Sequence, residues 1–391
     1  MIKRPVVFIA GRPFAEPCTG LDVRTDLYAN MLARIFCDAP KCLIVPISKE
    51  SDRTYYEKMG WEVYPLRFET QMEQNCKRLL GALRCRLTDD SFGEILRVRG
   101  CSVRIPPSLI RKVQSRMPNA IYWLYRSDYW NLVRFRKPGE SWIIDTNDSI
   151  YHLQRAYGWN CKTRRWIFRC SDDKLAELMK KHESVWPSKY DLVLAICKAD
   201  EDLFKRVMGG ANVARLDISI ALADNHGAFP ARSISLGYLG ADHAGSVAIA
   251  RRLIELAESG LFGTRELVIA GRCTAFLPQS GQGFRCIGRV EDAMGFWKSC
   301  EAVILPEAQP TGISTKFQQA VVSGCKVFAK KGAVEWSRAV LGVHYLTYED
   351  ESELPDMLSQ AALKNPTHPA PVFQMSAVQQ DINKILSTYG I

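Results

Sequence analysis

The sequence predicts an α/β protein with two doubly wound domains, and three observations support this. Short apolar runs recur along the chain, separated by stretches long enough for a helix. These runs form two series, one in each half, which indicates two parallel sheets covered by helices on both faces. The chain has 391 residues, 47% of them hydrophobic and 24% charged, which suits two globular domains and not a disordered chain.

The first series of predicted strands lies in the N-terminal half. Its apolar runs occupy residues 6–10, 42–47, 63–66, 120–125, 142–144 and 192–196. An amphipathic pattern over 22–36 predicts the helix that follows the first strand. We therefore expect a Rossmann-like N-terminal domain over residues 1–217.

The second series begins after a weakly patterned segment, 217–233, which contains Pro230. Its apolar runs occupy residues 234–239, 267–270, 284–287, 302–305 and 326–329. They predict a second Rossmann-like domain over residues 234–375. An amphipathic helix in residues 376–391 follows a Pro-rich stretch, and we expect it to cross back to the N-terminal domain.

Composition excludes several classes of protein. No apolar run approaches the roughly 20 residues that span a bilayer, and the run 6–10 is too short for a signal peptide core. The 13 cysteines include no Cys-x-x-Cys pair, and several lie in apolar runs, as expected of buried thiols in the cytoplasm. The six histidines lack ligand spacing, so we expect no metal and no other cofactor. Motifs of dehydrogenases, kinases and serine hydrolases are absent.

The net charge of +10 is concentrated in two clusters of the N-terminal half. Residues 77–116 hold ten Lys or Arg against three acids, and residues 162–169 place four cations around Trp166 without an acid. Cations mixed with aromatic rings favour an anionic membrane surface. We expect peripheral contact with the inner membrane face and no nucleic acid partner, although a solvated face explains the charge equally well.

The segment 302–329 carries the clearest chemical pattern, a strand, a loop, a helix, a glycine and a second strand. Gly312 in the loop allows a ligand to approach the backbone. Ser314 and Thr315 lie near the start of the helix, where free N–H groups and the dipole attract anions. Lys316 adds a charge suited to phosphate, and Gln319 lies one turn further along. The alternative is an ordinary αβ unit with a well-capped helix.

This segment resembles the donor-binding signature of GT-B glycosyltransferases, and the resemblance extends over about residues 185–340. The strand at 234–240 resembles the one that opens the C-terminal domain of that fold. Gly271 and Arg272 match the strand end that approaches the diphosphate, and Arg289 and Val290 match the loop beside the base. The resemblance implies that a nucleotide sugar binds here.

Three further residues belong to the predicted sites. Glu307 lies beside the donor signature and is expected to hold sugar hydroxyls. Gly11 and Arg12 follow the first strand, where they either line the acceptor side of a cleft between the domains or form a simple turn.

The departures from the family pattern bear on the mechanism. A large retaining family of this fold, family four, has two glutamates where this chain has Thr311 and Gln319. Lys316 followed by Gln319 is closer to the xanthan glucuronosyltransferase, an inverting enzyme whose base is an aspartate in an N-domain loop. Asp148 matches that position in this sequence.

Inverting transfer requires a carboxylate that takes the proton of the acceptor hydroxyl. Asp145 and Asp148 follow the strand at 142–144, so one can orient the loop while the other, which we expect to be Asp148, reacts. The alternative for both is an Asx-turn or a helix N-cap.

The sequence thus predicts a glycosyltransferase that acts on a saccharide or lipid-linked saccharide acceptor in surface polysaccharide synthesis. Two alternatives remain open: a sugar-nucleotide 2-epimerase on the same fold, and a non-enzymatic binding protein that uses its basic surface.

Overall fold

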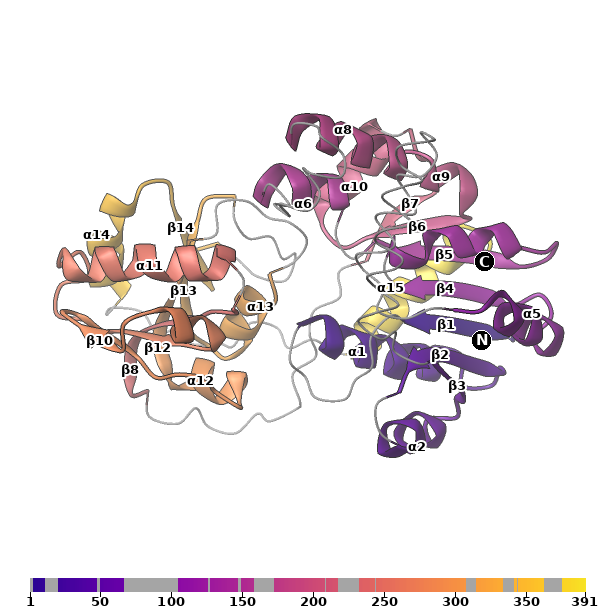
Figure 1. Cartoon of the computed structure of the whole chain (residues 1–391), viewed down its shortest axis with the longest axis horizontal. Helices are drawn as coiled ribbons and strands as arrows, with labels where there is room; N and C mark the ends of the chain where they lie inside the picture. The colour runs from indigo at the N-terminus through magenta and orange to yellow at the C-terminus, as the bar shows by residue number, and fades with distance from the viewer. Residues whose placement is uncertain are drawn as a thin grey trace. The chain divides into compact units, whose positions relative to one another are not determined.

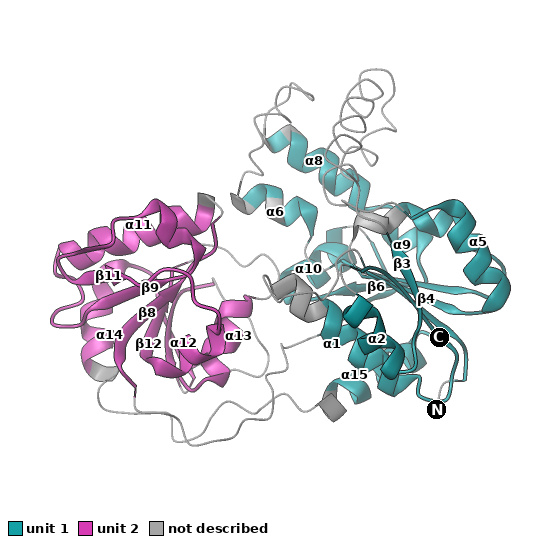
Figure 2. Ribbon diagram, turned by 60° about the horizontal axis from the view of Figure 1, so that its bottom comes forward, with its two compact units in different colours: residues 1–218, 375–391 teal, residues 219–374 magenta. Residues whose placement is uncertain are grey.

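The structure is a computed structural model that describes residues 3–10, 20–47, 50–66, 105–125, 127–146, 149–157, 172–207, 209–216, 232–242, 244–306, 314–332, 341–342, 344–361 and 375–391. The chain divides into two compact units, which Figure 2 colours teal and magenta. Unit 1 comprises Met1–Ile218 and Met375–Ile391, and unit 2 comprises Ser219–Gln374. Each unit is an α/β layer structure with its own sheet (Figure 1).

Unit 1 contains a seven-stranded parallel sheet with the order β3-β2-β1-β4-β5-β6-β7. Its strands are β1 (Val6–Ala10), β2 (Lys41–Pro46), β3 (Glu62–Leu66), β4 (Ile121–Tyr125), β5 (Ser141–Asp145), β6 (Leu192–Ala195) and β7 (Val213–Arg215). The direction of winding reverses between β1 and β4, which is the arrangement of a doubly wound fold. The central strands are buried on both faces because helices cover both.

The helical segments of unit 1 are α1 (Gly20–Ile35), α2 (Glu50–Lys58), α5 (Pro107–Arg116), η2 (Ser127–Phe135), α6 (Ile150–Tyr157), α8 (Asp172–Glu183), α9 (Trp186–Lys189), α10 (Lys198–Asp202), η3 (Leu203–Val207) and α15 (Met375–Thr388). Apolar residues of α5, α9 and η3 pack on one face of the sheet. On the other face, the Tyr28 ring of α1 contacts Phe8 and Trp123. The last helix, α15, contacts α1 and therefore belongs to this unit.

Unit 2 contains a second seven-stranded sheet, with the order β10-β11-β9-β8-β12-β13-β14. Its strands are β8 (Ile234–Leu239), β9 (Leu267–Ala270), β10 (Ser280–Gly281), β11 (Phe284–Cys286), β12 (Cys300–Leu305), β13 (Lys326–Lys330) and β14 (Tyr345–Tyr348). Only the β10–β11 pair among them is antiparallel. The winding reverses between β8 and β12, as it does between β1 and β4 of unit 1.

Two hydrophobic clusters sandwich the sheet of unit 2. The helical segments are α11 (Ala244–Glu258), η4 (Arg272–Phe276), α12 (Ala293–Ser299), α13 (Thr315–Val322), η5 (Glu351–Glu353) and α14 (Leu354–Ala361). Residues of α11 and α14 fill one cluster, and residues of α12 and α13 fill the other. Helices α13 and α11, which follow the two strands at the reversal point, thus pack on opposite faces.

The predicted class of two Rossmann-like doubly wound domains is confirmed. Strands were not predicted at β7, β10 and β14, which are short or only partly apolar. The cysteines that the structure describes are free, and five of these seven are buried. Among the described helices, none combines the length and the hydropathy of a membrane-spanning segment.

Candidate functional site

The reversal point between β8 and β12 is where a doubly wound sheet offers a binding site, beyond the carboxyl ends of the strands. Three glycines gather there. The amide of Gly240, after β8, donates to the carbonyl of Ala270 at 2.9 Å. The amide of Gly271, after β9, donates to the carbonyl of Gly288 at 2.8 Å. The loops after β8, β9 and β11 are therefore joined at this edge of unit 2.

The backbone conformation and close packing at position 271 require a glycine. Its backbone has φ +97° and ψ −177°, a conformation reserved almost entirely for glycine. A Cβ atom at this position would lie 2.2 Å from the carbonyl oxygen of Gly240. The predicted glycine at the end of β9 is thus explained by close packing of two loops, before any ligand is considered.

Helix α13 begins at this same edge. Ser314 is its N-cap, and its hydroxyl accepts from the amide of Phe317 at 3.2 Å. Thr315 and Lys316 occupy the first turn, and no acidic residue lies there. The turn therefore has amide donors and the positive end of the helix dipole, without a carboxylate to oppose an anion.

The Lys316 side chain extends from this turn towards β8, one of the two strands at the reversal point. Its Nζ atom lies 3.3 Å from the hydroxyl of Tyr238 and 4.8 Å from the centre of that ring. The ammonium charge also acts on the nearby buried thiol of Cys273, whose pKa burial raises to about 11. The Lys316 charge and backbone hydrogen bonds oppose this rise.

The other residues of unit 2 that are predicted to bind the nucleotide sugar differ in exposure and in their contacts. Arg272 is exposed and lies 3.4 Å from Asp242 in an ion pair. Arg289 is exposed, whereas Val290 is half-buried against the cluster of α12 and α13. Gln319 accepts a hydrogen bond of 3.1 Å from the indole of Trp297, so its side-chain oxygen is already engaged with α12.

Several predicted features lie outside the described residues. These are the donor-loop residues Glu307 and Gly312, the acceptor-side residues Gly11 and Arg12, the candidate base Asp148, the cluster at 162–169 and most of the cluster at 77–116. At the described end of the latter, Arg116 forms an ion pair with Glu62, and Lys112 lies 5.6 Å from the centre of the Tyr64 ring.

In unit 1, Asp145 ends strand β5 and is completely buried. Its carboxylate accepts a hydrogen bond from the hydroxyl of Tyr28 on α1. A carboxylate held in this way anchors the end of β5 to the covering helix. The contact favours the orienting role for Asp145 over the reacting one.

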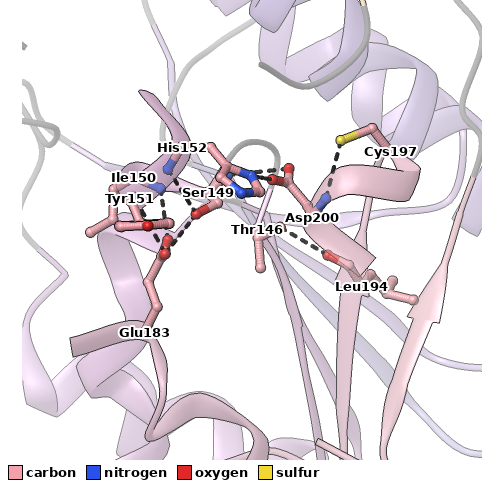
Figure 3. A network of polar contacts seen from close by, with 9 residues as sticks. All are labelled: Thr146, Ser149, Ile150, Tyr151, His152, Glu183, Leu194, Cys197 and Asp200. Atoms are coloured by element: carbon pink, nitrogen blue, oxygen red, sulfur yellow. Dashed lines mark hydrogen bonds and ion pairs between the residues drawn. The ribbon is translucent and has the colours of Figure 1, made fainter. Parts of the chain in front are cut away.

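The loop after Asp145 leads into a polar network at the start of α6 (Figure 3). The Glu183 carboxylate, from the end of α8, accepts from the Ser149 hydroxyl at 2.7 Å and from the Ile150 amide at 2.7 Å. Burial, with a smaller contribution from the nearby charge of Asp200, raises the pKa of Glu183 to about 8, although these donors oppose the shift. Glu183 is therefore a buried acid that caps the N-terminus of α6.

The second half of this network joins His152 and Asp200. Asp200 lies on α10, just after β6, and its Oδ1 atom is 2.6 Å from Nδ1 of His152. Its Oδ2 atom accepts from the Ser149 amide at 3.3 Å, so Ser149 lies between the two carboxylates (Figure 3). The sequence assigns no role to His152. Its partner Asp200 lies 48 residues further along the chain, so no local sequence pattern indicates the pair.

Comparison with known proteins identifies the fold. No protein-family model matches the sequence, and no curated protein sequence matches it. Among solved structures, the sucrose-phosphate synthase of Thermosynechococcus elongatus matches with a TM-score of 0.62 at 10% identity, over 99% of each chain. TarM of S. aureus matches with a TM-score of 0.59 at 10% identity, over 99% of this chain and 98% of TarM.

A third solved structure, Anabaena HepE in complex with UDP and glucose, matches with a TM-score of 0.52 at 11% identity, over 98% of this chain and 99% of HepE. The chain therefore has the GT-B fold, as the donor-loop resemblance predicted. Identities near 10% show the fold and leave the chemistry to be argued from the site.

Proposed function

We propose that the protein is a glycosyltransferase that moves a sugar from a nucleotide sugar to a saccharide or lipid-linked saccharide. One observation carries this proposal: Lys316, on the first turn of α13, reaches Tyr238 at the reversal point of a GT-B C-terminal unit. A cation at the N-terminus of a helix whose first turn has no acid suits a diphosphate. HepE and TarM, two proteins of this fold, have been solved with UDP bound.

The chemistry assigned to this edge is stabilisation of the leaving group. As the bond between the anomeric carbon and the diphosphate breaks, negative charge grows on the phosphate oxygens. Lys316 and the amides of the first turn of α13 are donors that oppose this charge. Arg272 is exposed beside Asp242, and we propose that it exchanges this partner for the diphosphate.

The acceptor must lose a proton, and we assign this step to the carboxyl edge of unit 1. The sequence predicts Asp148 as the base, with inversion at the anomeric carbon as the outcome. Asp145 is hydrogen-bonded to Tyr28 and fixes the end of β5, which precedes Asp148 in the chain. Among the described residues, this edge also contains the imidazole of His152, which can accept a proton.

The donor half is tested by thermal unfolding with UDP, GDP, TDP and CDP. A ligand that binds only the folded protein at a hundredfold excess over its dissociation constant stabilises it by about 2.7 kcal/mol. We expect one nucleotide to stabilise the protein and Lys316→Ala to remove most of that gain. Lys298→Ala is the matched control, because Lys298 lies at the opposite end of the sheet, on the last turn of α12.

Three outcomes would contradict the proposal. No stabilisation by any nucleotide would leave a non-enzymatic binding protein as the better account. Equal loss in Lys316→Ala and Lys298→Ala would place the nucleotide elsewhere. A sugar nucleotide converted to its epimer without an acceptor would indicate an epimerase on the same fold.

A further inference from the structure

His152 and Asp200 come from two neighbouring strands of unit 1. His152 lies in the first turn of α6, which follows β5, and Asp200 lies in α10, which follows β6. Strands β5 and β6 are parallel neighbours, so both residues lie at the carboxyl edge of the sheet. This is the edge where α/β proteins bind their ligands. The pair thus combines a basic ring and a carboxylate at the place where an acceptor is expected.

The hydrogen bonds of Asp200 determine which ring nitrogen carries the proton. The carboxylate is completely buried, and its two oxygens contact Nδ1 of His152 and the Ser149 amide. An ionised carboxylate only accepts hydrogen bonds, so the Nδ1 atom of a neutral ring must be the donor. The lone pair of the ring then lies on Nε2, the atom that can accept a proton.

The His152 ring is partly exposed, unlike its partner. The His152 side chain is 25% exposed, whereas that of Asp200 is 1% exposed. Within the described part of the chain, Nε2 has no hydrogen-bond partner. The other titratable groups nearby are Glu183, which contacts the same Ser149, and Lys180, whose Nζ lies 5.7 Å from the centre of the Tyr151 ring. Among the described residues, the ring is therefore held at Nδ1 and has no hydrogen-bond partner at Nε2.

We propose that His152 is a catalytic residue that accepts the proton of the acceptor hydroxyl, and that Asp200 is its positioning residue. This rests on the proposed glycosyl transfer. The hydroxyl proton moves to Nε2, and the oxygen electron pair forms the bond to the anomeric carbon. The bond from that carbon to the diphosphate breaks, and its electron pair leaves with the diphosphate. Asp200 stabilises the imidazolium until the proton passes to solvent.

This assignment changes the role of Asp148. The sequence predicts Asp148 as the base, whereas the geometry of the described residues gives an oriented ring with an open nitrogen four residues later. On this proposal Asp148 binds hydroxyls of the acceptor and His152 takes the proton. The two assignments predict different kinetics for the same pair of variants.

The first test needs no substrate. Long-range proton–nitrogen NMR spectra of protein labelled with ¹⁵N-histidine report the protonation of each ring nitrogen, and the chain has only six histidines. His152→Asn identifies the His152 signals by their loss. We expect a neutral ring protonated at Nδ1 in the wild type and an altered tautomer in Asp200→Asn. A ring protonated at Nε2 would overturn the proposal, because that atom could not accept a proton.

The second test separates the two candidate bases. The assay measures UDP release from a UDP-sugar with alkyl glycosides as hydroxyl donors. A positioned general base contributes about 100-fold or more, so His152→Ala should lower kcat by that factor while UDP binding is unchanged. Added imidazole should restore part of the rate, which a purely structural loss would not allow. Asp200→Asn should lower kcat by about tenfold or more, because the ring loses the partner that fixes its tautomer.

Asp148→Asn should raise the KM of the acceptor more than it lowers kcat. Arg155→Ala, an exposed change on the same helix α6, should leave the rate unchanged. Full turnover in His152→Ala, or a loss without imidazole rescue, would refute the role of His152 while glycosyl transfer stands. A wild-type protein that binds no nucleotide and transfers no sugar would instead refute the proposed function itself.

Discussion

The close packing around Gly271 can be tested by measuring the free energy of unfolding of a variant. An alanine there must adopt φ +97° and place its Cβ atom 2.2 Å from the Gly240 carbonyl oxygen. Backbone strain of this kind costs about 1–3 kcal/mol, and the displaced carbonyl adds to it. We expect Gly271→Ala to lower the free energy of unfolding of unit 2 by about 2–4 kcal/mol in urea titrations.

Gly260 provides the control for that prediction. It also has a positive φ, +78°, but a Cβ atom there would meet nothing within 4 Å. Gly260→Ala should therefore cost only the conformational part, about 1 kcal/mol. Equal losses in the two variants would show that the contact with Gly240 has no energetic weight.

Single residues also show why the site was only partly predictable. Ser314 and Lys316 were found because helix starts have a local sequence signature. Asp145 and His152 are explained by distant partners, Tyr28 at a separation of 117 residues and Asp200 at 48. No local pattern encodes such pairs, so one sequence without relatives cannot reveal them.

Among the elements, α6 and α8 are joined by a buried acid. Glu183, the last residue of α8, accepts from the backbone of Ile150 at the start of α6, and burial raises its pKa to about 8. The folded protein therefore keeps this proton to a higher pH than the unfolded chain does. Between about pH 4.5 and pH 8 the unfolded state binds fewer protons, so the stability due to this group falls as pH rises.

Glu183→Gln keeps the acceptor oxygen and removes the titration. We expect the difference in unfolding free energy, wild type minus variant, to fall by up to about 1.4 kcal/mol per pH unit in that window. Denaturant titrations at pH 5, 6, 7 and 8 measure this difference. Glu177→Gln, an exposed change on the same helix, should show no such slope. A flat difference for Glu183→Gln would mean that the carboxyl titrates as it does in the unfolded chain.

The elements themselves were largely predictable because parallel strands are buried on both faces and appear as continuous apolar runs. All five positions of β1 and of β4 are buried, and both strands were predicted. Strand β14 has only one buried residue among its four, and strand β10 has two exposed residues. Such edge strands are formed by pairing with a neighbour, which their own residues do not indicate.

At the scale of the whole molecule, the division into two units allows the stability of one unit and ligand binding by the other to be measured separately. The nucleotide is proposed to bind unit 2, whereas the last helix of the chain, α15, packs within unit 1. Its residues Val378, Ile382 and Leu386 are buried, and the hydroxyl of Tyr389 donates to the Val213 carbonyl at 2.9 Å. The C-terminal segment thus stabilises the unit where the chain begins.

Removal of a buried side chain from α15 should therefore destabilise unit 1 selectively. Leu386 is 1% exposed, and Leu→Ala changes at such sites cost about 2–5 kcal/mol. In calorimetry with and without the stabilising nucleotide, Leu386→Ala should lower one unfolding transition, and the nucleotide should raise the other. Asn383→Ala, an exposed change on α15, should move neither. If the variant and the nucleotide shift one common transition, the units unfold together, and binding in unit 2 is coupled to the packing of unit 1.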